Sequence, residues 1–235
     1  MKTKTLRENI PFFNTKMITR GGNSLRSGRT YEETIKLLLT CISIRNVKLE
    51  VKETTAGAGW GNDIVFTHGD TKIGIEIKNK GGFEGGGKTL KHNGTLWEVP
   101  EDCFMKNVIG DANPYNGQIP ACFTEKKLSV WNQAKHLFGD IYIEKPETIV
   151  SDYYREKGCA YIQIKGKGLY HTGTDILNLG VPLFSVHTML RIRVTKHMKN
   201  GVPTDVTAAL VFKRKDIKIS SYCLETNLPP SMKAE

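Results

Sequence analysis

Apolar residues recur at the spacing of an amphipathic helix near the start of the chain. They occupy one side of the segment 29–44 at about 3.6 residues per turn. Thr30 is the predicted N-cap, and residues 1–28 are polar and irregular enough to form an N-terminal arm. The apolar members of the predicted helix are Tyr31, Ile35, Leu38, Leu39 and Ile42.

Strict alternation of apolar and polar residues follows, which is typical of strands with one buried face. It predicts a strand over residues 47–52 and a β-hairpin from residues 63–67 and 72–78, whose short connection contains Gly69. Residues 81–120 are rich in glycine with little periodicity, and we interpret them as an inserted loop region. Later patterns predict a helix over 125–138 and strands over 160–165, 189–196 and 206–213.

This order of elements predicts an α/β fold in which helices flank a mixed central β-sheet. The chain has 235 residues, which favours one large domain over two independent ones. We place that domain at residues 29–226, followed by a polar tail at 227–235.

The charge of the chain is basic and unevenly distributed. Lys and Arg number 34 against 24 Asp and Glu, which gives a net charge of +10, and residues 185–220 carry +6 of it. The five cysteines are scattered without the spacing of a zinc site or a disulfide framework. The chain also lacks an apolar membrane-spanning stretch and a signal peptide, so we expect a soluble cytoplasmic protein.

The predicted hairpin carries the candidate chemistry. Glu76 and Lys78 alternate with isoleucines, so they share one face of their strand, and pairing of the two strands brings Asp63 toward Glu76. Two converging carboxylates bind a hard divalent cation such as Mg²⁺. Such a centre suits phosphodiester cleavage, in which Lys78 would orient the attacking water or stabilise charge developing at phosphorus.

These residues resemble the PD-(D/E)XK nuclease superfamily, which includes many type II restriction endonucleases. The resemblance rests on residues 61–66, the step of thirteen residues from Asp63 to Glu76, and the sequence Glu76-Ile77-Lys78. Asn62 stands where the family name has proline. The family implies an αβββαβ core, which is the order predicted above. It also implies an auxiliary acid on the first core helix, where Glu32 fits better than Glu33.

The resemblance implies a metal-dependent DNA endonuclease that uses Mg²⁺, with Mn²⁺ as a substitute. Asp63 and Glu76 would be the metal ligands, Lys78 the catalytic lysine and Glu32 the auxiliary acid. The chain length suits a site-specific, type II restriction-like enzyme that acts on double-stranded DNA as a homodimer, without a membrane or a small-molecule cofactor. A Holliday-junction resolvase or repair-type nuclease is the near alternative, and RNA remains open as a substrate.

Two alternatives belong to other functional classes. A non-catalytic nucleic-acid-binding module would keep the basic surface but would not depend on Lys78. A P-loop nucleotide-binding enzyme is suggested by residues 82–89, which match G-x-x-x-x-G-K-T and include Lys88. That motif works where a buried strand passes into a helix, and residues 90–95 do not favour a helix.

Basic residues outside the hairpin are candidates for contacts with DNA phosphates. Two lie in the predicted insertion and one directly precedes it. Three more lie on or at the end of the strand 189–196, where alternation places two arginines on one face. An exposed polar face is the competing interpretation of that strand. The candidate nucleic-acid-binding residues are Lys80, Lys88, Lys91, Arg191, Arg193 and Lys196.

Overall fold

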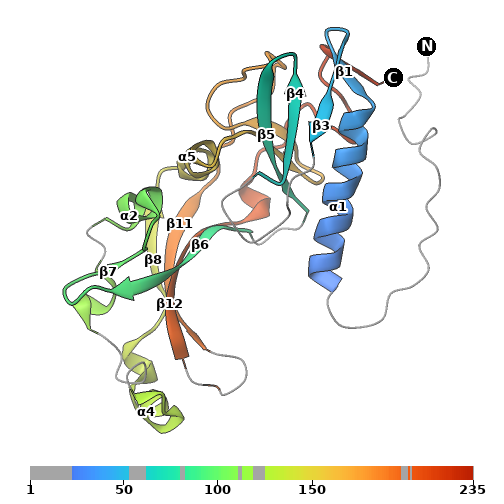
Figure 1. Ribbon diagram of the computed structural model, residues 1–235. Helices are drawn as coiled ribbons and strands as arrows, with labels where there is room; N and C mark the ends of the chain where they lie inside the picture. Colours follow the sequence, from blue (N-terminus) through green and yellow to red (C-terminus); the bar gives the residue numbers. More distant parts are fainter. Residues whose placement is uncertain are drawn as a thin grey trace. The chain divides into compact units, whose positions relative to one another are not determined.

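The computed structural model describes residues 23–52, 62–79, 83–110, 113–118, 125–196, 201 and 203–234. The protein is a mixed α/β structure, as its sequence predicts, and the chain divides into two compact units (Figure 1). Unit 1 contains Met1–Gly81, Tyr154–Ser185 and Ile217–Glu235, whereas unit 2 contains Gly82–Tyr153 and Val186–Asp216. The domain expected over residues 29–226 therefore extends across both units.

Unit 1 is built on a five-stranded sheet with the order β10-β9-β5-β4-β3. Its central pair β5 and β9 is parallel, and the other pairs are antiparallel. A second sheet, β13-β1-β2, pairs the C-terminal segment with residues near α1. The elements are α1 (Asn23–Thr40), β1 (Ile42–Ile44), β2 (Val47–Lys48), β3 (Glu50–Lys52), β4 (Ile64–His68), β5 (Thr71–Lys78), β9 (Cys159–Ile164), β10 (Gly168–His171) and β13 (Met232–Ala234).

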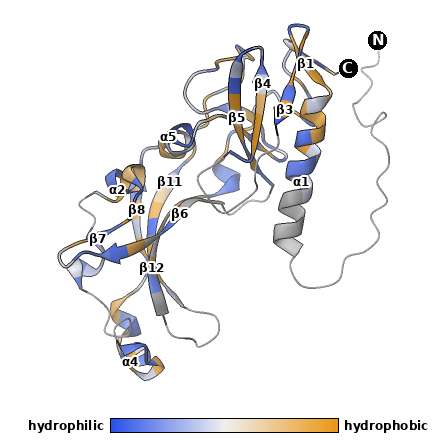
Figure 2. Cartoon of the chain, in the orientation of Figure 1, coloured by the Kyte–Doolittle hydropathy of each residue, from blue (hydrophilic) through white to orange (hydrophobic). Residues whose placement is uncertain are grey.

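The predicted face of α1 packs against this sheet. Tyr31, Ile35 and Leu39 are buried in one cluster with Ile73 and Ile75 of β5. Figure 2 shows the apolar colouring along much of β4 and β5. The hydrophobic pattern therefore predicts the buried face of α1 correctly. In an amphipathic helix or strand, the apolar residues recur on the side that packs against the core.

The ends of α1 differ from the prediction. The helix begins at Asn23, so Thr30 is not its N-cap but lies inside it, where its carbonyl accepts a hydrogen bond from Thr34 Oγ1 at 2.8 Å. Gly28 is a poor helix former and favours an end to the helix in the sequence, but a single glycine does not end this helix. At the other end, residues 42–44 form β1 instead of a last helical turn. Most of the predicted arm, residues 1–22, lies outside the described residues.

Unit 2 contains a five-stranded antiparallel sheet with the order β7-β6-β12-β11-β8. Leu190 and Leu210 face each other across β11 and β12, and both are fully buried. Its elements are β6 (Phe83–His92), β7 (Trp97–Glu98), α2 (Cys103–Ile109), η2 (Pro114–Gly117), α4 (Leu128–Ala134), η3 (Lys135–Leu137), β8 (Ile141–Lys145), β11 (Thr188–Lys196), β12 (Pro203–Phe212) and η4 (Arg214–Asp216). Helix α5 (Ile149–Glu156) spans the boundary between the units.

Where the structure describes the glycine-rich segment 81–120, it contains strands and helices instead of the predicted loop region. Its described part forms β6, β7, α2 and η2, and β6 is a ten-residue strand paired with β12. Glycine weakens a strand only by about 1 kcal/mol per residue, and long-range pairing with β12 overrides that preference. The tail 227–235 is also ordered in part, because β13 pairs with β1. Among the described residues, no helix combines the length and apolar character that a membrane span requires.

Candidate active site

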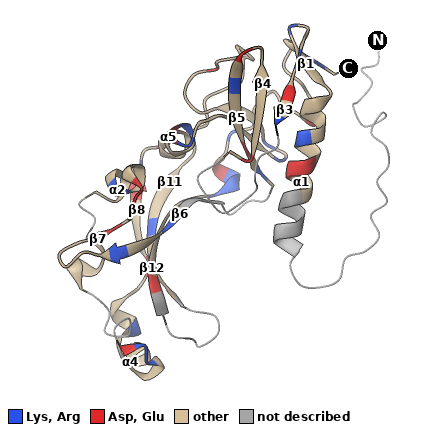
Figure 3. Cartoon of the chain, in the orientation of Figure 1, with Lys and Arg blue, Asp and Glu red and all other residues tan. Residues whose placement is uncertain are grey.

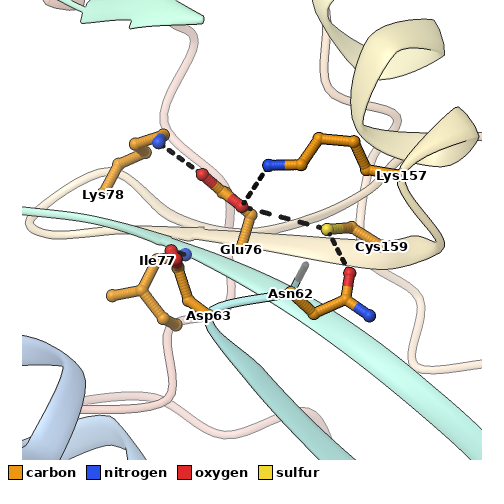
Figure 4. Close-up of polar contacts among 7 residues, drawn as sticks. All are labelled: Asn62, Asp63, Glu76, Ile77, Lys78, Lys157 and Cys159. Atoms are coloured by element: carbon orange, nitrogen blue, oxygen red, sulfur yellow. Dashed lines mark hydrogen bonds and ion pairs between the residues drawn. The ribbon is translucent and has the colours of Figure 1, made fainter. Parts of the chain in front are cut away.

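The β4–β5 hairpin places Asp63 opposite Glu76. Ile64 pairs with Ile75 across the hairpin, and this register sets the preceding Asp63 beside Glu76. The turn is short, and Gly69 adopts a φ of +58°, which favours glycine. Lys78 lies two residues after Glu76, and its ammonium donates a hydrogen bond to Glu76 Oε1 (Figure 4). The three residues that the sequence singles out therefore meet at one end of the hairpin.

Asp63 is held by the neighbouring strand and carries an unfavourable charge. Its Oδ2 accepts a hydrogen bond from the Ile77 amide at 2.8 Å. Burial raises the pKa of Asp63 to about 6, and the nearby negative charges of Glu76 and Glu32 act in the same direction. The Ile77 amide and the Lys78 ammonium only partly offset that shift. Asp63 therefore occupies a position where an added cation would be stabilising.

Glu32 approaches this group from α1. Its side chain is half-buried, whereas that of Glu33 is exposed. The charge of Glu32 contributes to the raised pKa of Asp63. The choice of Glu32 over Glu33 from the helical pattern thus agrees with the electrostatics of the site.

Glu76 is almost fully buried and contacts two lysines. Only 4% of the residue is exposed. Lys78 binds Oε1, and Lys157 Nζ lies 3.8 Å from Oε2. A buried carboxylate requires such partners, because an unpaired charge in this environment would cost several kcal/mol. Glu76 is therefore fixed from both sides (Figure 4).

Both lysines also contact the ring of Tyr154, at the end of α5. Lys78 Nζ lies 5.2 Å from the ring centroid and Lys157 Nζ lies 5.4 Å from it, within the range of cation–π attraction. Burial acts to lower the pKa of Lys78, but Tyr154 and the carboxylates of Glu76 and Asp63 outweigh it and raise that pKa above its usual range. Lys78 is accordingly a cation at neutral pH.

Asn62 is anchored beneath the site. The Cys159 thiol donates a hydrogen bond to Asn62 Oδ1 at 2.7 Å, and a longer one to Glu76 Oε2 at 3.9 Å. Burial raises the pKa of Cys159, so the thiol keeps its proton and acts as a donor. Gly74 makes room for the Asn62 amide, since a Cβ at residue 74 would come within 2.3 Å of Asn62 Nδ2. These contacts fix the backbone that leads into Asp63.

The donor set suits a magnesium ion. Asp63 and Glu76 offer carboxylate oxygens, and Mg²⁺ commonly binds one or two carboxylates while keeping several waters. Within the described part of the chain, no group of three or more His, Cys, Asp and Glu side chains gathers closely enough to enclose a metal ion.

The basic residues predicted to contact DNA are placed differently from one another. Lys88 forms an ion pair with Asp102, at 3.2 Å, and Asp102 is 1% exposed. Lys91 is exposed on β6. Lys80 lies outside the described residues, as does the side chain of Lys196.

Arg191 and Arg193 share one face of β11, as alternation predicts. Arg193 binds Asp140 through two nitrogens, with Nη2 at 2.5 Å from Oδ2 and Nε at 3.2 Å from Oδ1. Arg191 also acts on Asp140, whose pKa is lowered chiefly by the hydrogen bonds from Arg193. Figure 3 shows the basic segments of β6 and the acidic segment of β12 in the same unit. One carboxylate thus offsets part of the positive charge on this sheet face.

Residues 83–89 of the P-loop-like motif lie within strand β6. The backbone of β6 is extended and pairs with β12, so it does not wrap around a phosphate at the start of a helix. The lysine of the motif, Lys88, is bound to Asp102. The geometry of these residues therefore gives no support to a nucleotide site.

Three residues that contact the site are not predicted from the sequence. Lys157, Tyr154 and Cys159 come from α5, β9 and the turn between them, about 80 residues after Glu76. The only local signal is a basic residue and a glycine directly before the apolar strand 159–164. Parallel pairing of β5 with β9 brings them to Glu76, with Ile162 beside it in register.

Comparison with known proteins adds no relative: no protein-family model matches the chain, and neither a curated protein nor a solved structure is found to be similar to it. The functional interpretation therefore rests on the residues and their geometry.

Proposed function

We propose that this protein is a metal-dependent nuclease that hydrolyses phosphodiester bonds in DNA, and specifically a site-specific endonuclease of the type II restriction-like kind. The observation that carries the proposal is the placement of Asp63 opposite Glu76, with Lys78 bonded to Glu76 from the same strand. The order α1, β3, β4, β5, α5, β9, with the short β1 and β2 between α1 and β3, supports an αβββαβ core. Unit 2 interrupts unit 1 twice, with residues 82–153 after β5 and residues 186–216 after β10. In this proposal the second core helix is α5 and not the predicted helix over residues 125–138.

Asp63 and Glu76 would hold Mg²⁺, or Mn²⁺ in its place. When bound, the metal would polarise a phosphoryl oxygen and lower the pKa of an attacking water. Asp63 is suited to this role because burial and its acidic neighbours already make its charge unfavourable without a cation. Glu32 adds negative charge to the same place and serves as the auxiliary acid.

Lys78 acts as a cation rather than as a base. Its raised pKa keeps it protonated at neutral pH, so its ammonium can orient a water molecule or stabilise charge that develops at phosphorus. The contact with Tyr154 and the hydrogen bond to Glu76 fix the ammonium before substrate arrives. Such preorganised charge is typically worth about 100-fold to 1,000-fold in rate.

The test is cleavage of supercoiled plasmid and long phage DNA by wild type, Lys78→Met and Lys165→Met, with Mg²⁺ or Mn²⁺ against EDTA. Lys165 is the matched control, because it is another lysine of unit 1 whose ammonium lies over a tyrosine, 4.9 Å from the Tyr31 ring centroid. We expect metal-dependent cleavage that falls at least about 100-fold in Lys78→Met and persists in Lys165→Met.

The products separate the subclasses. Discrete fragments support site-specific cleavage, and a dimer in light scattering would accompany it, since a homodimer can cut both strands symmetrically. Nicked circles or smears instead favour a resolvase or repair-type nuclease. DNA binding without cleavage under either metal would contradict the proposal and favour a non-catalytic binding module.

A further inference from the structure

A second lysine competes for the carboxylate that the proposed metal would use. Lys78 takes Oε1 of Glu76, and Lys157 Nζ lies 3.8 Å from Oε2. Each oxygen of Glu76 thus faces a different ammonium. A divalent cation bound by Glu76 would need at least one of these oxygens, so its arrival and the Lys157 contact oppose each other.

Lys157 is held in this position by its surroundings. Its side chain is 12% exposed, and its ammonium lies over the ring of Tyr154, which is 2% exposed. The next residue, Gly158, has a φ of +82°, and its amide binds the Arg155 carbonyl at 2.8 Å. This tight turn after α5 presents Lys157 to the site. The contact is therefore part of the folded core and not a surface ion pair of an extended side chain.

The charges around Glu76 decide which lysine a divalent cation would displace. Asp63, Glu76 and Glu32 bring three negative charges, and Lys78 and Lys157 bring two positive ones. A divalent cation would reverse the excess, so one ammonium would then meet like charge. Lys78 is bonded to Glu76 within β5 itself, whereas Lys157 lies at a longer distance on a separate element. Lys157 is the cation that can give way.

We propose that Lys157 is a positioning residue that occupies Glu76 Oε2 in the metal-free protein and thereby weakens the affinity of the site for divalent cations. This inference rests on the proposed function, because it takes Asp63 and Glu76 as the metal ligands. Lys157 retains its contact with Tyr154 when Glu76 binds metal. The site accordingly responds to a higher metal concentration than its carboxylates alone would require.

The experiment measures Mn²⁺ binding by the full chain without nucleic acid, by calorimetry and by the paramagnetic resonance of free Mn²⁺. Lys157→Met and Lys157→Gln remove the competing charge, and both should bind Mn²⁺ about tenfold more tightly than wild type. Lys157→Arg keeps the charge and should stay within about twofold of wild type. Lys165→Met is the matched control and should leave Mn²⁺ binding unchanged.

Unchanged or weaker Mn²⁺ binding in a folded Lys157→Gln or Lys157→Met variant would overturn the inference while leaving the proposed function in place. Asp63→Asn distinguishes the two failures. If wild type binds no Mn²⁺, or binds it equally well after Asp63→Asn, the metal site itself is refuted and the inference falls with it. A thermal melt of each variant in EDTA establishes that it is folded.

Discussion

Asp63 is the residue at which the proposed function and the stability of the fold oppose each other most clearly. Its pKa is about 6 in the folded protein against 3.8 for an ordinary aspartate, so the folded state binds more protons between these values. The free energy of unfolding therefore falls as the pH rises from about 4 to about 6. Above pH 6, the ionised Asp63 carboxylate destabilises the folded state by its full amount of about 3 kcal/mol.

Asp63→Asn should remove that cost while keeping an oxygen for the Ile77 amide. We expect the variant to be more stable than wild type by up to about 3 kcal/mol at pH 8 and nearly equal to it at pH 4. Urea denaturation in EDTA at the two pH values measures the difference. A variant that is less stable than wild type at pH 8 would show that the Asp63 carboxylate is instead favourably placed.

Lys88 has a structural partner, which changes the expected effect of its substitution. Asp102 is buried, caps α2 by accepting the Met105 amide at 2.8 Å, and pairs with Lys88. Lys88→Met should lower the free energy of unfolding by about 3 kcal/mol, because it leaves a buried carboxylate without its counter-charge.

A double-variant cycle isolates that pair. Asp102→Asn preserves a capping oxygen, and we expect Lys88→Met with Asp102→Asn to be more stable than Lys88→Met alone. Denaturant unfolding of the three variants measures the coupling. If the losses simply add, the ion pair contributes nothing to stability.

At the scale of elements, the junction of β4, β5 and β9 depends on one small residue. A Cβ on Gly74 would come within 2.3 Å of Asn62 Nδ2 and 2.5 Å of the Gly158 carbonyl. Gly74→Ala should therefore destabilise the protein by about 2 kcal/mol and reduce cleavage by moving Asn62 and the adjacent Asp63.

Gly139→Ala is the matched control for this substitution. A Cβ on Gly139 would meet nothing within 4 Å, so the change should stay within about 0.5 kcal/mol of wild type. Thermal melts and cleavage rates of both variants test the comparison. Equal effects would mean that the space beside Gly74 is not what holds Asn62 in place.

The elements that the sequence predicts correctly are those with local causes. The hairpin of β4 and β5 follows from alternation and a short turn, and the buried face of α1 follows from its helical repeat. Strand β6 and helix α5 have weak local signals. Pairing with β12 forms β6 despite its glycines. Helix α5 is amphipathic, but it has only eight residues, which is a short segment to recognise from sequence.

At the scale of the whole molecule, the net charge of +10 favours polyanions, but the structure reduces its effect in one place. Asp140 binds Arg193 and is also affected by Arg191. If Arg191 and Arg193 contact DNA phosphates, as the sequence predicts, Asp140→Asn should raise the affinity for duplex DNA several-fold. The slope of log affinity against log salt concentration should also steepen by about one, because about one more counterion is released.

Fluorescence anisotropy with a labelled duplex, over a series of NaCl concentrations in EDTA, measures both quantities. Glu144→Gln serves as the control, because Glu144 is an acid of neighbouring β8 whose carboxylate pairs with His187 at 2.8 Å. If Asp140→Asn has the DNA affinity and the salt dependence of wild type, the DNA contact lies on another surface.

The sequence by itself determined the mixed α/β class, the hairpin and the meeting of Asp63, Glu76 and Lys78. The hairpin and the meeting of the three side chains depend on residues within sixteen positions of one another, where strand periodicity and a short turn fix the register. Only the tertiary structure decided that Lys157 and Tyr154 join Glu76, that Lys88 pairs with Asp102, and that the chain divides into two units. Those outcomes depend on which distant strands pair, and that choice is made by the burial of the whole sheet and not by any local pattern.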